Sequence, residues 1–127
     1  MKAERNSNTG GFGPLINLIT MEQKNQVIIR GIVGNARVQD IGNTQTIRFS
    51  VATDYCFKDK SGGMVCETTW HQVTAFKNDR MPDFSTITKG TGIEVEGRLR
   101  NIRYTDNLGN EKTMTEILAT DIKTFAR

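Results

Sequence analysis

The chain has 127 residues, 36% of them hydrophobic and 24% charged, so it fits one domain with its own core and is too short for two enzyme-sized domains. Its mean hydropathy is −0.46 and no apolar run approaches membrane-spanning length, which argues against a membrane protein. The net charge of +3 favours polyanionic partners, yet 17 basic residues against 14 acidic ones is no histone-like excess. Any nucleic-acid site is therefore expected to be a local patch.

The first segment, residues 1–24, is polar and contains several glycines, apart from a short apolar run at residues 15–19. This composition predicts a flexible N-terminal arm ahead of a domain at residues 25–127. The apolar run is too short for a signal-peptide core and no small-residue cleavage pattern follows it, so we expect a cytoplasmic protein. The arm is either a tail without a role or a segment that packs on a neighbouring subunit.

Alternation of apolar and polar residues predicts five β-strands after the arm. Glycines in the first strand permit a bulge or sharp coiling. In the second strand Ile47, Phe49 and Val51 are expected to face inward and Ser50 outward. In the fourth strand Leu99 is expected as the last inward position. The five strands are expected at residues 26–34, 46–53, 68–76, 92–104 and about 112–122.

The spacing of apolar residues changes over residues 81–90, between the third and fourth strands. Pro82 stands near the start, Phe84 and Ile87 are three apart, and Gly90 closes the segment, which predicts a short helix. Five strands with one helix at this place are the order expected of an all-β OB-fold, a small, partly open Greek-key barrel. The exposed sheet and hairpin loops of that fold form a groove for oligonucleotides or oligosaccharides, although fold alone does not establish function.

Two cysteines, Cys56 and Cys66, flank the turn at residues 59–63 and can face each other across a hairpin. A disulfide is geometrically conceivable. We nevertheless expect free thiols, because disulfides are rare in the cytosol and no secretory signal is evident. A zinc site formed with His71 has the wrong spacing and lacks a fourth ligand, so no metal or other cofactor is expected.

The third predicted strand carries two rings and two polar residues on one face. Strand alternation places Trp70, Gln72, Thr74 and Phe76 together, with His71 on the other side. A core-facing side would not carry Gln and Thr between its aromatic residues. This face is therefore expected to be partly exposed to solvent, or to pack against a partner rather than the core of this chain.

Two further aromatic residues, Phe57 and Tyr104, stand beside charged turn residues, where burial in the hydrophobic core is not expected. A binder of single strands needs rings for the bases and cations for the phosphates. One face of the fourth strand carries Arg98, Arg100 and Tyr104. Arg103 lies on the opposite face of a regular strand, although the twist of the hairpin could turn it toward the others. The remaining candidate cations are Lys58, Lys60 and Lys89.

No pattern of residues indicates catalysis, so we expect a protein that is not an enzyme. His71 has no nucleophile motif beside it, and its plainest role is an interface or hydrogen-bonded structural histidine. Glu94 and Glu96 are two apart on a strand, which is typical of ordinary solvated charge rather than a carboxylate pair. Glycine-rich phosphate loops and HExxH-type metal motifs are absent from the sequence.

Five segments together closely resemble the bacterial single-stranded DNA-binding protein family. The likeness runs in the same order from about residue 25 to residue 122, and the combined set is specific although each piece alone is weak. The resemblance implies an OB-fold barrel, a homotetramer, and sequence-tolerant, nucleoid-associated binding of single-stranded DNA in replication, recombination and repair. The segments are residues 25–31, 49–53, 70–73, 89–90 and 95–100.

The resemblance also assigns roles to individual residues. The rings of the family match Phe57, Trp70, Phe76 and Tyr104, and Phe57 and Tyr104 stand where the family commonly has Trp. His71 matches a subunit-interface position. The matching basic positions of the groove are Lys58, Lys60, Lys89 and Arg100.

The chain differs from the family pattern at its end, where Phe125, Ala126 and Arg127 follow the last strand directly. The family usually continues into a flexible linker and an acidic tip that recruits partner enzymes, so a member without a tail is expected and recruitment through a tail is not supported. A protein-interaction module or a primosomal replication accessory protein remains open as an alternative. An oligosaccharide-binding barrel is less suited, because cations around the rings match phosphates better than sugars.

Overall fold

The computed structural model describes residues 21–125 and contains five strands that close into a barrel in the order β1-β2-β3-β5-β4. The all-β OB-fold expected from the sequence is confirmed. Most of the predicted N-terminal arm, residues 1–20, lies outside the described residues. The strands are β1 (Val27–Ile41), β2 (Thr44–Lys58), β3 (Met64–Phe76), β4 (Gly92–Thr105) and β5 (Glu111–Phe125).

The barrel closes because β1 pairs with two strands and because β3 and β5 pair in parallel. The first half of β1 is antiparallel to β4 and its second half is antiparallel to β2. A β-bulge between Val33 and Ala36 lies close to the change of partner, as the glycines of this stretch permit. The parallel contact is short and joins Val73 to Ile117 and Ala75 to Ala119.

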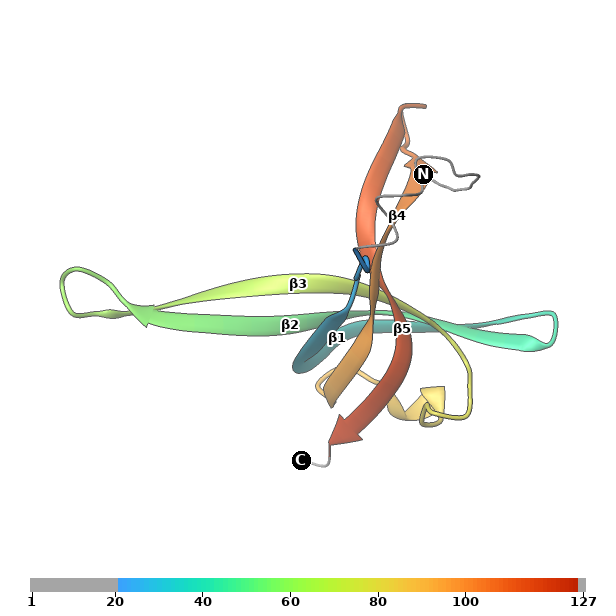
Figure 1. Ribbon diagram of the computed structural model, residues 1–127, viewed down its shortest axis with the longest axis horizontal. Coiled ribbons are helices and arrows are strands. Elements are labelled where there is room, and N and C mark those ends of the chain that lie inside the picture. Colours follow the sequence, from blue (N-terminus) through green and yellow to red (C-terminus); the bar gives the residue numbers. More distant parts are fainter. Residues whose placement is uncertain (1–20, 126–127) are drawn as a thin grey trace.

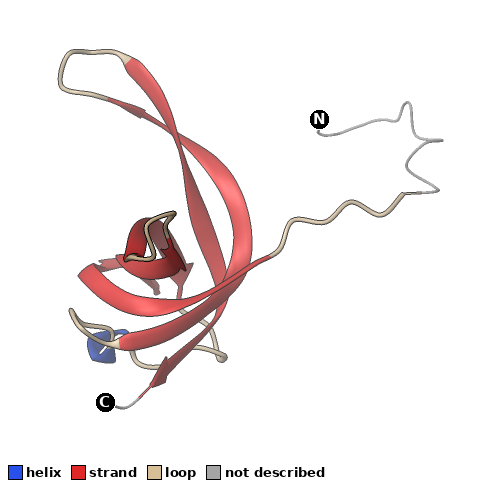
Figure 2. Ribbon diagram, turned by 90° about the vertical axis from the view of Figure 1, so that its left-hand side faces the viewer, coloured by secondary structure: helices blue, strands red, loops and turns tan. Residues whose placement is uncertain are grey.

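The strands are longer than the sequence predicts, and three hairpins extend beyond the barrel. β2 takes part in two of them, so the β1–β2 and β2–β3 hairpins point in opposite directions (Figure 1). The β4–β5 hairpin leaves the barrel in a third direction, away from the end where β5 finishes (Figure 2). These arms carry several of the predicted site residues.

The core lies inside the barrel and is built from the inward positions of every strand. Ile47, Phe49 and Val51 are buried as predicted. Leu99 is 45% exposed, so its predicted inward position is wrong: β4 has passed the bulge at Glu96 and Gly97 and has entered the β4–β5 arm. Ser50 lies on the outer face, opposite Gln72, as predicted, but it is buried there, because its hydroxyl accepts a hydrogen bond from the Asn35 N–H of β1.

The helix predicted over residues 81–90 is reduced to one 3-10 turn, η1 (Phe84–Thr86), which begins after the Asp83 cap. β-branched residues at positions 86–88 and Pro82 disfavour a longer helix. Phe84 and Ile87 are buried and fill one end of the barrel. Within residues 21–125, this turn is the whole helical content, and no helix there has the length and apolarity to cross a membrane.

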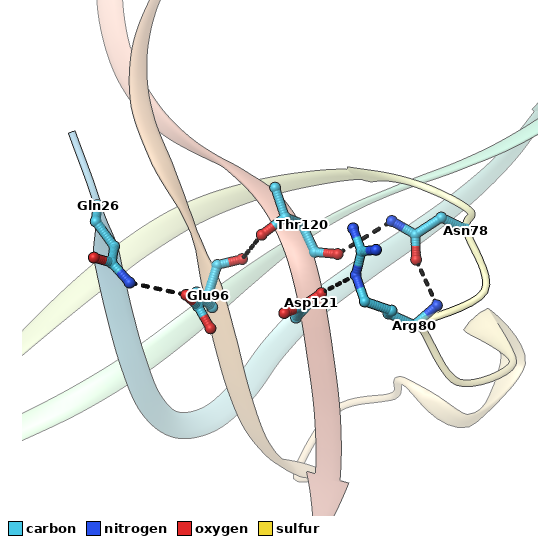
Figure 3. Close-up of polar contacts among 6 residues, drawn as sticks. All are labelled: Gln26, Asn78, Arg80, Glu96, Thr120 and Asp121. Atoms are coloured by element: carbon cyan, nitrogen blue, oxygen red, sulfur yellow. Dashed lines mark hydrogen bonds and ion pairs between the residues drawn. The ribbon is translucent and has the colours of Figure 1, made fainter. Parts of the chain in front are cut away.

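Polar contacts join Gln26, just before β1, to β4, and join β5 to the segment that follows β3 (Figure 3). The Gln26 amide donates to the Glu96 carboxylate (2.9 Å), and the Asn78 amide donates to the Thr120 carbonyl (3.1 Å). The Arg80 guanidinium forms an ion pair with Asp121. The charge of Arg80 is therefore neutralised within the chain.

The β2–β3 turn is organised by the carboxylate of Asp59. Its Oδ1 accepts hydrogen bonds from the N–H groups of Ser61 (3.0 Å) and Gly63 (2.8 Å) and from the Ser61 hydroxyl (2.8 Å). Gly62 has φ 89°, which favours glycine. These hydrogen bonds to the charged form, that of the Ser61 hydroxyl first, lower the pKa of Asp59 below its ordinary value.

The β4–β5 turn repeats this construction with Asp106. The Asp106 N–H donates to the Asn110 carbonyl (2.9 Å), and Oδ1 accepts from the N–H groups of Leu108 and Asn110, both at 2.9 Å. Asp and Asn side chains that bond the backbone two residues on are a common way to fix a turn. Both arms therefore end in turns fixed by their own side chains.

Candidate nucleic-acid interface

Trp70 lies in the middle of β3 on the outer face of the sheet. An added Cβ at Gly34 of β1 would be 2.5 Å from Cζ3 of Trp70 and 2.8 Å from the Ser50 hydroxyl, so the ring rests against a strand backbone that has no side chain there. The residue is nevertheless 57% exposed. A ring supported on one side and open on the other is suited to stacking a base.

An open hollow of about 330 Å³ lies beside the Trp70 ring. Its lining combines a ring, amides and guanidinium groups from β1, β2 and β3. The sequence analysis did not single out the two arginines of this hollow, because each appears alone in the sequence and only the β1–β2 register brings them together. The lining residues are Asn35, Ala36, Arg37, Arg48, Phe49, Ser50, Trp70 and Gln72.

Phe76 ends β3 on the same strand face as Trp70 and is 45% exposed. The two rings are six positions apart in the sequence, which corresponds to about 20 Å along a strand. Between them Gln72 is exposed, but Thr74 is buried, so the expectation of a wet face is wrong at that position. The reason is that β5 pairs with β3 there and Glu116 accepts a hydrogen bond from the Thr74 hydroxyl (2.8 Å).

Phe57 lies on the β2–β3 arm, opposite Val65, and is 37% exposed. Tyr55, two residues earlier, is 68% exposed and its ring centroid lies 5.9 Å from that of Phe57. The sequence analysis missed Tyr55, although the two-residue spacing from Phe57 already places both on one strand face. The continuous β2–β3 register places this pair on the opposite face of the ribbon from Trp70.

Tyr104 lies near the tip of the β4–β5 arm, opposite Lys112, and is 44% exposed. Arg98 and Arg103 on the same strand are exposed, with strand alternation turning Arg103 to the other face. Arg100 differs from them, because its Nε lies 2.7 Å from Oε2 of the buried Glu116. This predicted groove cation is therefore engaged inside the chain.

The three predicted lysines are exposed and lie in separate places. Lys58 is opposite Met64, on the ribbon face of Trp70, and Lys60 is in the β2–β3 turn. Lys89 lines a second hollow, formed with η1 and the Gly34 bulge of β1. The candidate residues therefore form an outer-face group around Trp70 and two arm groups, rather than one cluster.

His71 lies on the face of β3 opposite Trp70, as predicted. Its Nε2 shares a 2.9 Å hydrogen bond with the Thr53 hydroxyl, and the side chain is half-buried. Its proposed place at a subunit interface remains a prediction.

Cys56 and Cys66 form a disulfide, so the expectation of free thiols is wrong. The β2–β3 register places them directly opposite each other with their Cα atoms 4.1 Å apart, as in non-hydrogen-bonded strand pairs. The expectation failed because it rested on cellular compartment rather than on register. Over the described part of the chain, no group of three or more His, Cys, Asp or Glu side chains is arranged to hold a metal ion.

Residues 24–125 match the model of the Single-strand binding protein family. Single-stranded DNA-binding protein 1 of Chlorobaculum tepidum is 33% identical over 104 residues, which cover 78% of this chain and 63% of the relative. The mitochondrial single-stranded DNA-binding protein of Drosophila melanogaster is 35% identical over 103 residues, 80% of this chain and 70% of the relative. The chain thus spans about two thirds of the length of these relatives.

Solved structures of similar fold include the Plasmodium falciparum SSB in complex with ssDNA, with a TM-score of 0.70 at 21% identity, covering 84% of this chain and 98% of that one. A deletion mutant of the single-stranded DNA binding protein from Thermus aquaticus has a TM-score of 0.64, also at 21% identity, over 81% of this chain and 51% of that one. These likenesses agree with the barrel described above. On the match over residues 24–125, the chain belongs to the single-strand binding protein family.

Proposed function

We propose that this protein binds single-stranded DNA with little sequence preference, stacking bases on its exposed rings and pairing phosphates with its free cations. Trp70 is the observation that carries the proposal, since its ring is supported by Gly34 and open to solvent beside a hollow lined by cations. Membership of the single-strand binding protein family supports it independently. The protein would act in the cytoplasm, in replication, recombination and repair, without a catalytic step.

Fluorescence provides a direct test, because Trp70 is the only tryptophan of the chain. Oligo-dT is expected to quench its emission, and the quenching is expected to weaken as salt is added, since phosphate contacts release counterions. A parallel titration with oligo-U measures the preference for DNA over RNA. Unchanged emission together with no mobility shift at low salt would contradict the proposal.

A matched pair of substitutions locates the interaction. Trp70→Leu is expected to weaken binding of labelled oligo-dT by about 1–3 kcal/mol, a magnitude known from single-strand-binding proteins of this kind. Phe125→Leu removes another exposed ring, which lies under Arg30 at the end of β5, and is expected to leave affinity unchanged. An equal loss of oligo-dT affinity in the two variants would show that Trp70 has no special part in binding the DNA.

The proposal includes assembly into a homotetramer, as the family resemblance implies. The outer side of β1 supports self-association, because Ile28 and Ile32 are exposed there. Light scattering is expected to give four times the mass of the chain. A monomeric mass that persists at high protein concentration, with DNA binding intact, would contradict this part of the proposal.

A further inference from the structure

Arg37 of β1 and Arg48 of β2 stand directly opposite each other in the β1–β2 ladder. Residues paired in this way share a face of the sheet and have their Cβ atoms about 4.5–5.5 Å apart. Two like charges in that position disfavour the fold. The pair therefore costs stability unless something outside the chain neutralises it.

Neither guanidinium has an acidic partner in residues 21–125. Three other arginines are paired: Arg30 with Glu94 at 2.7 Å, Arg80 with Asp121, and Arg100 with Glu116. Arg98 and Arg103 of β4 also lack an acidic partner in the described part of the chain, but each lacks a second arginine opposite it. Figure 3 shows the contact of Arg80 with Asp121 of β5. The two arginines of the β1–β2 ladder are thus available to an anion.

The location of the two arginines indicates which anion fits. Both line the hollow beside Trp70, together with the amide side chains of Asn35 and Gln72. No carboxylate lines that hollow. Guanidinium groups bind phosphate through two parallel hydrogen bonds, and amides can both donate to and accept from any base.

We infer that Arg37 and Arg48 form a phosphate clamp for the nucleotide whose base stacks on Trp70. The inference rests on the proposed function and adds two residues to the site that neither the aromatic pattern nor the family resemblance indicated. In the bound state one backbone phosphate lies between the two guanidinium groups and relieves their repulsion. The clamp reads no base, so it contributes affinity and register rather than sequence preference.

The test is the salt dependence of oligo-dT binding by the whole chain, followed through Trp70 fluorescence. For single strands, log K falls by about 0.7 per log salt for each phosphate neutralised. Because the clamp neutralises one phosphate, the double variant R37Q/R48Q is expected to bind with a slope smaller in magnitude by about 0.7. Each single variant is expected to lose about half of that, which keeps the test available if the double variant fails to fold.

A charge-matched control is R80Q/K123Q, which also removes two positive charges, from the η1 side and from β5. Its slope is expected to stay within error of the unsubstituted chain. A slope of R37Q/R48Q equal to that of the control would overturn the clamp while leaving single-strand binding intact. Absence of binding by the unsubstituted chain would instead overturn both.

Discussion

Arg100 illustrates how a basic residue on a predicted binding face can serve the fold. Its guanidinium and the Thr74 hydroxyl both bond the carboxylate of Glu116, which is buried. Removing the cation leaves an uncompensated buried charge, which is costly. We predict that Arg100→Gln lowers the free energy of unfolding by about 2–3 kcal/mol, since Arg100 keeps part of its exposure.

Arg98→Gln is the matched control, because Arg98 is exposed and has no ion-pair partner in the described part of the chain. Its unfolding free energy is expected to change by no more than about 0.5 kcal/mol. Urea unfolding of the two variants measures the difference. Equal stabilities would show that the contact between β4 and β5 contributes little.

Gly34 decides the position of the Trp70 ring. Because an added Cβ would be 2.5 Å from the ring, Gly34→Ala is predicted to displace Trp70, shift its emission and weaken oligo-dT binding. Gly63→Ala is the control, since its nearest contact would be an ordinary 3.5 Å to the Asp59 carboxylate. Unchanged emission in Gly34→Ala would show that the ring does not depend on this contact.

At the scale of elements, the disulfide ties the two strands of the β2–β3 arm next to Phe57. Its cysteines are ten residues apart, and closing a loop of this length contributes roughly 2–3 kcal/mol in the chain-entropy view. We predict that the C56S/C66S variant, or reduction by dithiothreitol, increases tryptic cleavage after Lys58 and Lys60. Dithiothreitol should not change the cleavage of C56S/C66S, and any further increase would point to another cause.

The same arm is predicted to loosen in acid. The pKa of Asp59 is lower in the folded chain than its ordinary value, so the carboxylate stabilises the turn above that value and the contribution is lost as the pH falls through the folded pKa. Hydrogen exchange of the Ser61 and Gly63 amides is therefore expected to lose protection below a pH of about 4. Asp59→Asn should abolish this pH dependence of protection, and protection that stays pH-dependent in the variant would refute the explanation.

For the whole molecule, the succession of five strands along the chain and most of their inward positions could be predicted because alternation and turn residues are local signals. The exposure of Trp70 and Phe76 followed from the same alternation, and that of Phe57 and Tyr104 from the charged turn residues beside them. The disulfide, the buried Thr74 and the Arg37 and Arg48 pair depend on which residues two strands bring opposite each other. Register is a property of the folded sheet, so single segments of sequence did not reveal it.

The arrangement of the site also belongs to this scale. Trp70 and Phe76 lie on one face of the β2–β3 ribbon, and Tyr55 and Phe57 lie on the other. Tyr104 lies on the β4–β5 arm, which points in another direction (Figure 1). A DNA strand that contacts all of these rings has to pass across the outer face of the barrel and bend around an arm. The proposal is therefore one of wrapping rather than of a straight groove.

Photo-crosslinking tests this path most directly. Oligo-dT carrying 5-iododeoxyuridine at successive positions would be irradiated with the protein, and the linked peptides identified by mass spectrometry. The account predicts crosslinks at Trp70 and on both arms, at Tyr55 or Phe57 and at Tyr104. Crosslinks confined to Phe125 and the side of the barrel around it would contradict the account.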